Sequence, residues 1–214
     1  MMQKLLPPIV LECPECGEKY LVSPESNRLS ENATIYTDGY FDDDQIWRTP
    51  GIIGCVTCEL GFTPQTGKVI ATPDWDDFYQ NWSEIKKAAP PTAGSLALEL
   101  RARRNMNPET EKSIRKEFWY AVNHTEKGMS LFSKNEKFRN FWFESLNRYE
   151  ELLGTENPDE KLIKAEISRH LGRFEACFSL LDGFSGSLAE TIRQEAIKRN
   201  TFIIPVTGLK ISAA

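Results

Sequence analysis

Two Cys-x-x-Cys pairs, at residues 13–16 and 55–58, constrain the fold of this chain more than any other feature. Each pair forms a turn that brings two sulfurs to one side of the backbone. Two such turns supply the tetrahedral set of four thiolates that structural zinc prefers. The sequence therefore predicts a structural Zn²⁺ site with four ligands: Cys13, Cys16, Cys55 and Cys58. A redox role for the pairs is disfavoured because neither lies in a βαβ pattern.

We expect residues 1–72 to form a small, β-rich zinc ribbon around this site. The 38 residues between Cys16 and Cys55 exceed the ~15–20 of compact four-cysteine sites. We therefore expect an inserted hairpin over about residues 30–50, with its turn at Asp38-Gly39. Its acidic run could be a divalent-cation site, but a solvated loop tip is the simpler interpretation of Asp42, Asp43 and Asp44.

A helix is predicted directly after the ribbon. Thr72-Pro73-Asp74 has the composition of a helix start, with Thr72 as the N-cap. The apolar residues that follow share one helical face: Trp75, Phe78, Tyr79, Trp82 and Ile85. We expect this face to pack between the ribbon and the rest of the chain; the alternative is an exposed partner-binding face. A proline-containing break at residues 88–94 completes a helix-and-linker segment over residues 73–94.

The pattern is helical over residues 95–214, so the predicted fold class is α+β, a small β-rich ribbon followed by an all-α bundle. Helix starts are expected at Ser95, Asn107 and Asn157. A polar loop is expected around Gly128, an aromatic-rich helix over about 134–153, and a last helix over about 187–200. The apolar segment 202–206 is expected to dock back onto the fold.

One stretch of the helical domain resembles a known repeat. Residues 165–177 are similar to the helix-turn-helix unit of a tetratricopeptide repeat, with small residues at Ala165, Gly172 and Ala176. No second copy follows at a 34-residue period, so we expect a single repeat-like hairpin within an irregular bundle.

The whole layout resembles a group of uncharacterised bacterial proteins that join an N-terminal zinc ribbon to a helical, tetratricopeptide-like domain. The resemblance rests on the four cysteines, the Thr37-Asp38-Gly39 turn and residues 171–176. It implies an architecture and no biochemical activity.

Charge and composition narrow the possible partners. Residues 1–73 hold 5 basic and 10 acidic residues, whereas residues 95–214 hold 19 and 17. An acidic ribbon is poorly suited to the phosphate backbone of nucleic acids. A nucleic-acid groove stays open as an alternative at one basic cluster interleaved with Trp119 and Tyr120: Arg101, Arg103, Arg104, Lys112, Arg115 and Lys116.

The first residues lack the apolar run of a secretory signal, and no stretch has the ~20 apolar residues of a membrane span. We therefore expect a cytoplasmic protein with no membrane partner.

The sequence shows no catalytic constellation. His124 and His170 are expected to be structural or surface residues, and Cys177 a buried, inert thiol. Four cysteine ligands also leave zinc no open position for a reacting water.

We therefore predict a non-enzymatic interaction module, such as an adaptor, a regulator or an immunity-type protein, whose partner is another protein. The alternative is a nucleic-acid-binding regulator that uses the ribbon or the basic cluster.

Overall fold

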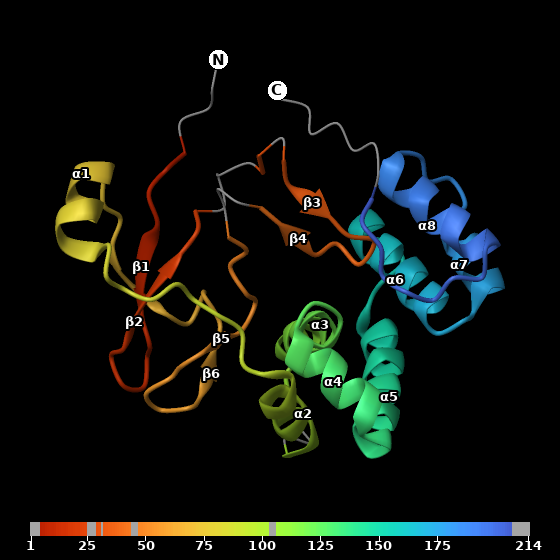
Figure 1. The fold of residues 1–214 in the computed structure, drawn as a ribbon, viewed down its shortest axis with the longest axis horizontal. Coiled ribbons are helices and arrows are strands. Elements are labelled where there is room, and N and C mark those ends of the chain that lie inside the picture. The colour runs from red at the N-terminus through yellow and green to blue at the C-terminus, as the bar shows by residue number, and fades with distance from the viewer. Residues whose placement is uncertain (1–4, 25–28, 31, 44–46, 103–105, 207–214) are drawn as a thin grey trace.

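The computed structural model describes residues 5–24, 29–30, 32–43, 47–102 and 106–206. Small antiparallel sheets occupy the N-terminal part and helices the rest, so the α+β prediction is confirmed at this level. Figure 1 shows β1, β2, β5 and β6 on one side, α2 to α5 in the middle and α6 to α8 on the other side, with the β3–β4 hairpin above α3 and next to α6. In the described part of the chain, no helix has the length and apolarity needed to cross a bilayer.

The main sheet has the strand order β2-β1-β7, with β1 at Ile9–Glu12, β2 at Lys19–Val22 and β7 at Lys68–Ala71. Side chains alternate between its two faces. Leu11, Tyr20 and Val22 pack into one core with the buried cysteines and with the small hairpin of β5 (Ile53–Gly54) and β6 (Gly61–Phe62). Val10 and Leu21 pack on the opposite face. Both faces of this short sheet are therefore covered.

The segment after the ribbon covers the second face of this sheet. It consists of α1 (Trp75–Asp77) and a π-helix, η1 (Phe78–Trp82). The predicted N-cap, Thr72, is wrong: the Asp74 side chain caps instead, accepting a hydrogen bond from the Asp77 N–H at 2.9 Å. The expected single buried face is also wrong, because Phe78 is buried against the sheet while Tyr79 is 66% exposed. The segment packs on the sheet rather than between the ribbon and the helices.

The predicted inserted hairpin is present within residues 30–50, as β3 (Thr34–Ile35) and β4 (Phe41–Asp42). Gly39 adopts a φ of +81° in its turn, a conformation that glycine takes without steric penalty. The C-terminal segment docks as expected, along the outer edge of β3. The Val206 N–H donates to the Ile35 carbonyl at 2.7 Å, and the Thr37 N–H donates to the Ile204 carbonyl at 3.0 Å.

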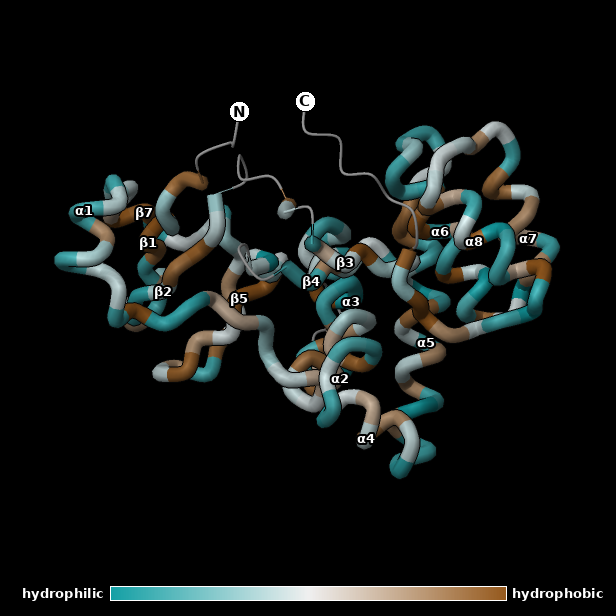
Figure 2. Tube along the Cα trace, turned by 45° about the horizontal axis from the view of Figure 1, so that its top comes forward, coloured by the Kyte–Doolittle hydropathy of each residue, from teal (hydrophilic) through white to brown (hydrophobic). Residues whose placement is uncertain are grey.

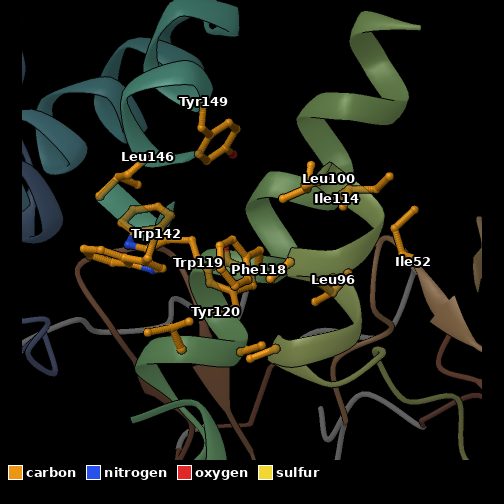
Figure 3. Close-up of a cluster of buried hydrophobic side chains, with 14 of the residues drawn as sticks. Ile52, Leu96, Leu100, Ile114, Phe118, Trp119, Tyr120, Trp142, Leu146 and Tyr149 are labelled. Atoms are coloured by element: carbon orange, nitrogen blue, oxygen red, sulfur yellow. The ribbon is translucent and has the colours of Figure 1, made fainter. Parts of the chain in front are cut away.

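The central helices are α2 (Ala93–Ala102), α3 (Pro108–Asn123), α4 (Glu126–Lys134) and α5 (Glu136–Leu152). They enclose an aromatic core that includes Phe118, Trp119 and Trp142, and Ile52 of the ribbon also belongs to it (Figure 3). Asn107 caps α3 as predicted. For α2 the predicted cap is wrong by three residues, because the Thr92 hydroxyl accepts the Ser95 N–H at 3.1 Å.

The predicted polar loop around Gly128 is wrong, since these residues form α4. Thr125 caps this helix by accepting the Gly128 N–H at 3.0 Å. A Cβ on Gly128 would lie 2.7 Å from the Cα of Val122 and would overlap the Ala121 carbonyl. Gly128 therefore marks a close crossing of α3 and α4, and its low helix propensity misled the sequence-based prediction.

The last group contains α6 (Pro158–His170), α7 (Phe174–Leu180) and α8 (Ser187–Ile197). Asn157 caps α6 as expected, and Gly172 turns the chain into α7 with a φ of +75°. These helices share a separate core, which includes Ala165, Cys177 and Ile192. Figure 2 shows the hydrophobic residues of α6 to α8 interleaved with hydrophilic ones along each helix. Membership in the tetratricopeptide group stays a prediction.

Candidate metal centre

The two cysteine pairs lie at corresponding places in two hairpins. Residues 13–16 connect β1 to β2, and residues 55–58 connect β5 to β6. The Sγ atoms of the four cysteines all lie within 4.8 Å of one another. Cys16 and Cys55 are 3.4 Å apart, and Cys13 and Cys58 are 3.8 Å apart. Sulfurs placed about 2.3 Å from a tetrahedral ion would be about 3.8 Å apart. The cluster therefore has the size of a four-sulfur metal site.

Matching backbone hydrogen bonds shape the two turns. The Cys13 N–H donates to the Glu18 carbonyl at 2.7 Å, and the Cys55 N–H donates to the Leu60 carbonyl at 3.0 Å. The residue after the second cysteine is left-handed in both turns, with φ of +78° at Gly17 and +60° at Glu59. The two knuckles thus share one backbone design, although only one of them places glycine at the left-handed position.

The four sulfurs differ in exposure. Cys13 and Cys55 are buried, Cys58 is half-buried and Cys16 is exposed. The first cysteine of each pair is thus enclosed by the ribbon core. The second cysteine of each pair is more exposed than the first. A metal ion held here would be anchored on the protein side and would lie near the surface.

Neighbouring polar groups orient the ligand atoms. The Tyr20 hydroxyl donates to Sγ of Cys55 at 3.3 Å and accepts the N–H of Val56 at 2.9 Å. The Thr57 hydroxyl donates to the carboxylate of Glu18 at 2.9 Å, which links one knuckle to the other. Such outer hydrogen bonds fix the orientation of metal ligands and tune their basicity.

The pKa of Cys55 shows the effect of these contacts. Burial opposes ionisation of its thiol, but hydrogen bonds from the backbone of Cys58, the Tyr20 hydroxyl and the backbone of Thr57 outweigh burial and lower the pKa to about 6. A thiolate is the form that binds metal. The effect is confined to Cys55: at Cys16 the backbone hydrogen bond of Glu18 lowers the pKa, but desolvation and contacts with the other sulfurs outweigh it and raise the pKa to about 12.

The predicted ligand set is thus brought together in full, and the four cysteines could hold a metal ion. The described aspartates of the hairpin show no comparable cluster. Asp42 is exposed, and Asp43 accepts the Ser30 N–H at 2.6 Å. Asp44 lies outside the described residues. Asp42 belongs to strand β4 and Asp43 is half-buried, so the loop-tip interpretation is wrong for Asp42.

His124 occupies a position that its sequence context does not reveal. Its Nε2 lies 2.7 Å from Oδ2 of the buried Asp38, and its ring stacks on Tyr40 with centroids 4.0 Å apart. The ring also lines a cavity of about 260 Å³ between the hairpin, α3 and residues 87–90. Asp38 and His124 are 86 residues apart, so no local pattern could have predicted this pair. The contact joins the β3–β4 hairpin to the C-terminal end of α3.

His170 and Cys177 are structural residues. The His170 ring lies between Trp119 and Trp142, and its Nδ1 accepts the indole N–H of Trp119 at 3.2 Å. Burial, with a smaller contribution from the charge of Arg169, lowers the pKa of His170 to about 3. Burial likewise raises the pKa of Cys177 to about 12, as expected of an inert thiol.

The basic cluster is largely engaged with other groups. Lys112 pairs with Glu160 at 2.7 Å and Arg115 with Glu111 at 2.7 Å. Arg101 lies over the ring of Phe141, and burial lowers the pKa of Lys116. Trp119 and Tyr120 are only 1% and 4% exposed, so their rings are not available to stack on bases. Arg103 and Arg104 lie outside the described residues.

Comparison with protein-family models, with curated proteins and with solved structures gives no match for this chain. The resemblance to the uncharacterised bacterial group stays a prediction.

Proposed function

We propose that this protein is a cytoplasmic, non-enzymatic interaction module whose ribbon is stabilised by a structural Zn²⁺ ion and whose partner is another protein. The observation that carries the proposal is the convergence of four sulfurs, from two hairpins, within 4.8 Å. Four thiolate ligands complete the coordination of zinc and leave no position for a substrate. The ion would therefore stabilise the folded ribbon and would not take part in a reaction.

The size of the ribbon supports a folding role for the ion. The core around the cysteines contains few large side chains, and the strands are two to four residues long. Small cores of this kind are commonly completed by a metal whose binding free energy becomes folding free energy. Zinc is preferred among divalent ions because tetrahedral sites of four thiolates select it.

The nucleic-acid alternative has weaker support. Its two candidate stacking rings, Trp119 and Tyr120, are buried in the helical core, and the ribbon is acidic. Binding of DNA or RNA is dominated by uncompensated Lys and Arg. A protein partner therefore agrees better with the surface that this chain presents.

Affinity capture of the tagged full chain from its native cells, with and without nuclease, tests the proposal. We expect a protein partner that survives nuclease and rebinds the purified chain at a defined stoichiometry. The partner should also bind a Cys177→Ala control, which retains the four ligands. Recovery of nucleic acid that disappears on nuclease treatment would support the alternative and contradict the proposal.

A further inference from the structure

The helical segment at residues 74–85 carries an aromatic pair at the edge of the molecule, formed by the half-buried Trp75 and the exposed Tyr79. Figures 1 and 2 both place α1 beyond the main sheet, on the side away from α2 to α8. Tyr79 is 66% exposed, and its ring stacks on that of Trp75 with centroids 5.6 Å apart and planes at 26°. Phe78 fills the core on this side of the sheet, whereas Tyr79 does not contribute to it. The exposure of Tyr79 is thus not explained by packing.

The backbone and its hydrogen bonds hold this pair in place. Phe78–Trp82 form a π-helix, a conformation seen in well under 1% of residues and often at functional sites. The Asp77 carboxylate accepts the Asn81 amide at 2.7 Å and the Trp82 indole N–H at 3.2 Å. The indole N–H of Trp75 donates to the carbonyl of Leu5 at 2.8 Å. These hydrogen bonds therefore hold the segment that carries the two rings in a defined position.

The segment that carries the pair is net acidic, even with Lys86 and Lys87 that follow it. Residues 74–85 contain four acidic residues and no basic one, and the ribbon beneath them is acidic as well. Asp76, next to Trp75 in the chain, is exposed. One ring of the segment already attracts a cation of this chain, because the Lys19 ammonium lies 5.5 Å from the centroid of Trp82. Aromatic faces flanked by carboxylates favour basic side chains.

We propose that Trp75, Asp76 and Tyr79 form a docking surface for a basic segment of a partner protein. An arginine or lysine of that segment would lie over the Tyr79 ring, with its charge near the carboxylate of Asp76. Nucleic acid would be repelled by the same carboxylates. The inference rests on the proposed function and specifies the chemistry of its partner.

Fluorescence anisotropy with the metal-loaded full chain tests the surface. The probe is a short labelled peptide of alternating arginine and glycine, and its control carries glutamate in place of arginine. We expect the arginine peptide alone to bind, with an affinity that falls as salt is added. Tyr79→Ser should weaken binding about two- to fivefold, the range of an exposed cation–π contact, while Tyr79→Phe should retain it. Asp76→Asn should weaken binding as well.

Matched controls remove similar groups elsewhere. Phe202→Ser removes another exposed ring, 76% exposed, and Glu175→Gln removes an exposed carboxylate of α7. Neither should change the affinity. No binding of the arginine peptide, or equal binding by Tyr79→Ser, would overturn the proposal. Concentration-dependent dimerisation that Tyr79→Ser abolishes would assign the surface to a second copy, and would overturn it too.

A partner captured equally by the wild-type chain and by Tyr79→Ser would overturn this surface but leave the interaction function standing. If neither chain captures a protein, the proposed function and the surface fail together.

Discussion

The hydroxyl of Tyr20 donates a hydrogen bond to Sγ of Cys55 across 3.3 Å, and the same oxygen accepts the N–H of Val56 at 2.9 Å. The Tyr20 ring packs beside Phe62, with centroids 5.9 Å apart, so the ribbon core sets its position. A residue of the sheet thus orients one ligand sulfur and closes the knuckle around it.

Replacing Tyr20 with Phe should therefore weaken metal binding while keeping the ring in the core. Loss of an outer hydrogen bond to a metal ligand typically lowers affinity 10- to 100-fold, and we expect about tenfold here. Competition with a chromophoric chelator measures the change. Tyr79→Phe, at an exposed ring remote from the sulfurs, is the matched control. Wild-type affinity in Tyr20→Phe would show that the hydroxyl does not support the site.

The two left-handed residues that follow the second cysteines should respond differently to substitution. Gly17→Ala should lower the free energy of unfolding by about 1 kcal/mol, because a Cβ is strained at a φ of +78°. Glu59→Gly should have little effect or raise it slightly, because it removes the same strain at +60°. Gly94→Ala, in the first turn of α2, should be neutral or stabilising. Chemical denaturation measures all three, and a Gly17→Ala variant as stable as Gly94→Ala would contradict the argument.

Glu117 should contribute strongly to the stability of the fold, because it joins the segment before the second knuckle to α3. Its buried carboxylate accepts two hydrogen bonds from Arg48, at 2.7 and 2.6 Å, and one from the Gly51 N–H at 2.7 Å. Glu117→Gln leaves the mostly buried guanidinium without its counter-charge, and breaking such pairs costs about 3–5 kcal/mol. Glu109→Gln, whose exposed carboxylate pairs with Lys112, should change stability by less than about 1 kcal/mol. Similar effects of the two substitutions would contradict this role.

Acidification should destabilise the fold through His170. Its folded pKa of about 3 lies below the ~6.5 of an unfolded chain, so the unfolded state binds the proton first as pH falls. The stabilisation is complete above pH ~6.5 and is lost progressively toward pH ~3. Between pH 7.5 and 5 we expect the free energy of unfolding to fall by about 1–2 kcal/mol. Partial exposure of His170 to solvent limits the size of this fall.

His170→Gln keeps an acceptor for the Trp119 indole and removes the titrating group. Denaturation curves of both chains across this range isolate the contribution of His170, because the other acid-sensitive groups are common to both. Parallel pH dependence in the two chains would contradict the assignment.

Local signals account for the parts of the fold that were predicted correctly. The cysteine spacing identified the four sulfurs, Asn107 and Asn157 identified two helix starts, and Asp38-Gly39 identified the hairpin turn. Each of these depends on residues within one turn of backbone. The capping error at Thr72 has the same origin, because Thr72 and Asp74 are both residue types that cap helices and the local pattern does not distinguish them.

The missed features depend on distant parts of the chain. α4 was missed because glycine signals a loop, yet only glycine fits where Gly128 crosses α3. The Asp38–His124 contact joins residues 86 apart. Arg169 and Glu166 form an ion pair with both side chains 0% exposed, and Arg169 also donates to the carbonyls of Asn200 and Phe202. No periodic pattern in the sequence indicates a buried ion pair of this kind.

The most direct test of the metal centre is the metal content of the purified full chain, measured by elemental analysis together with thermal unfolding. We expect one zinc ion per wild-type chain and per Cys177→Ala control, and loss of zinc with reduced stability in a Cys13→Ser, Cys16→Ser double variant. A double variant that retains a full equivalent of zinc, or a wild-type chain that folds with unchanged stability after zinc is removed, would contradict a structural four-cysteine zinc site.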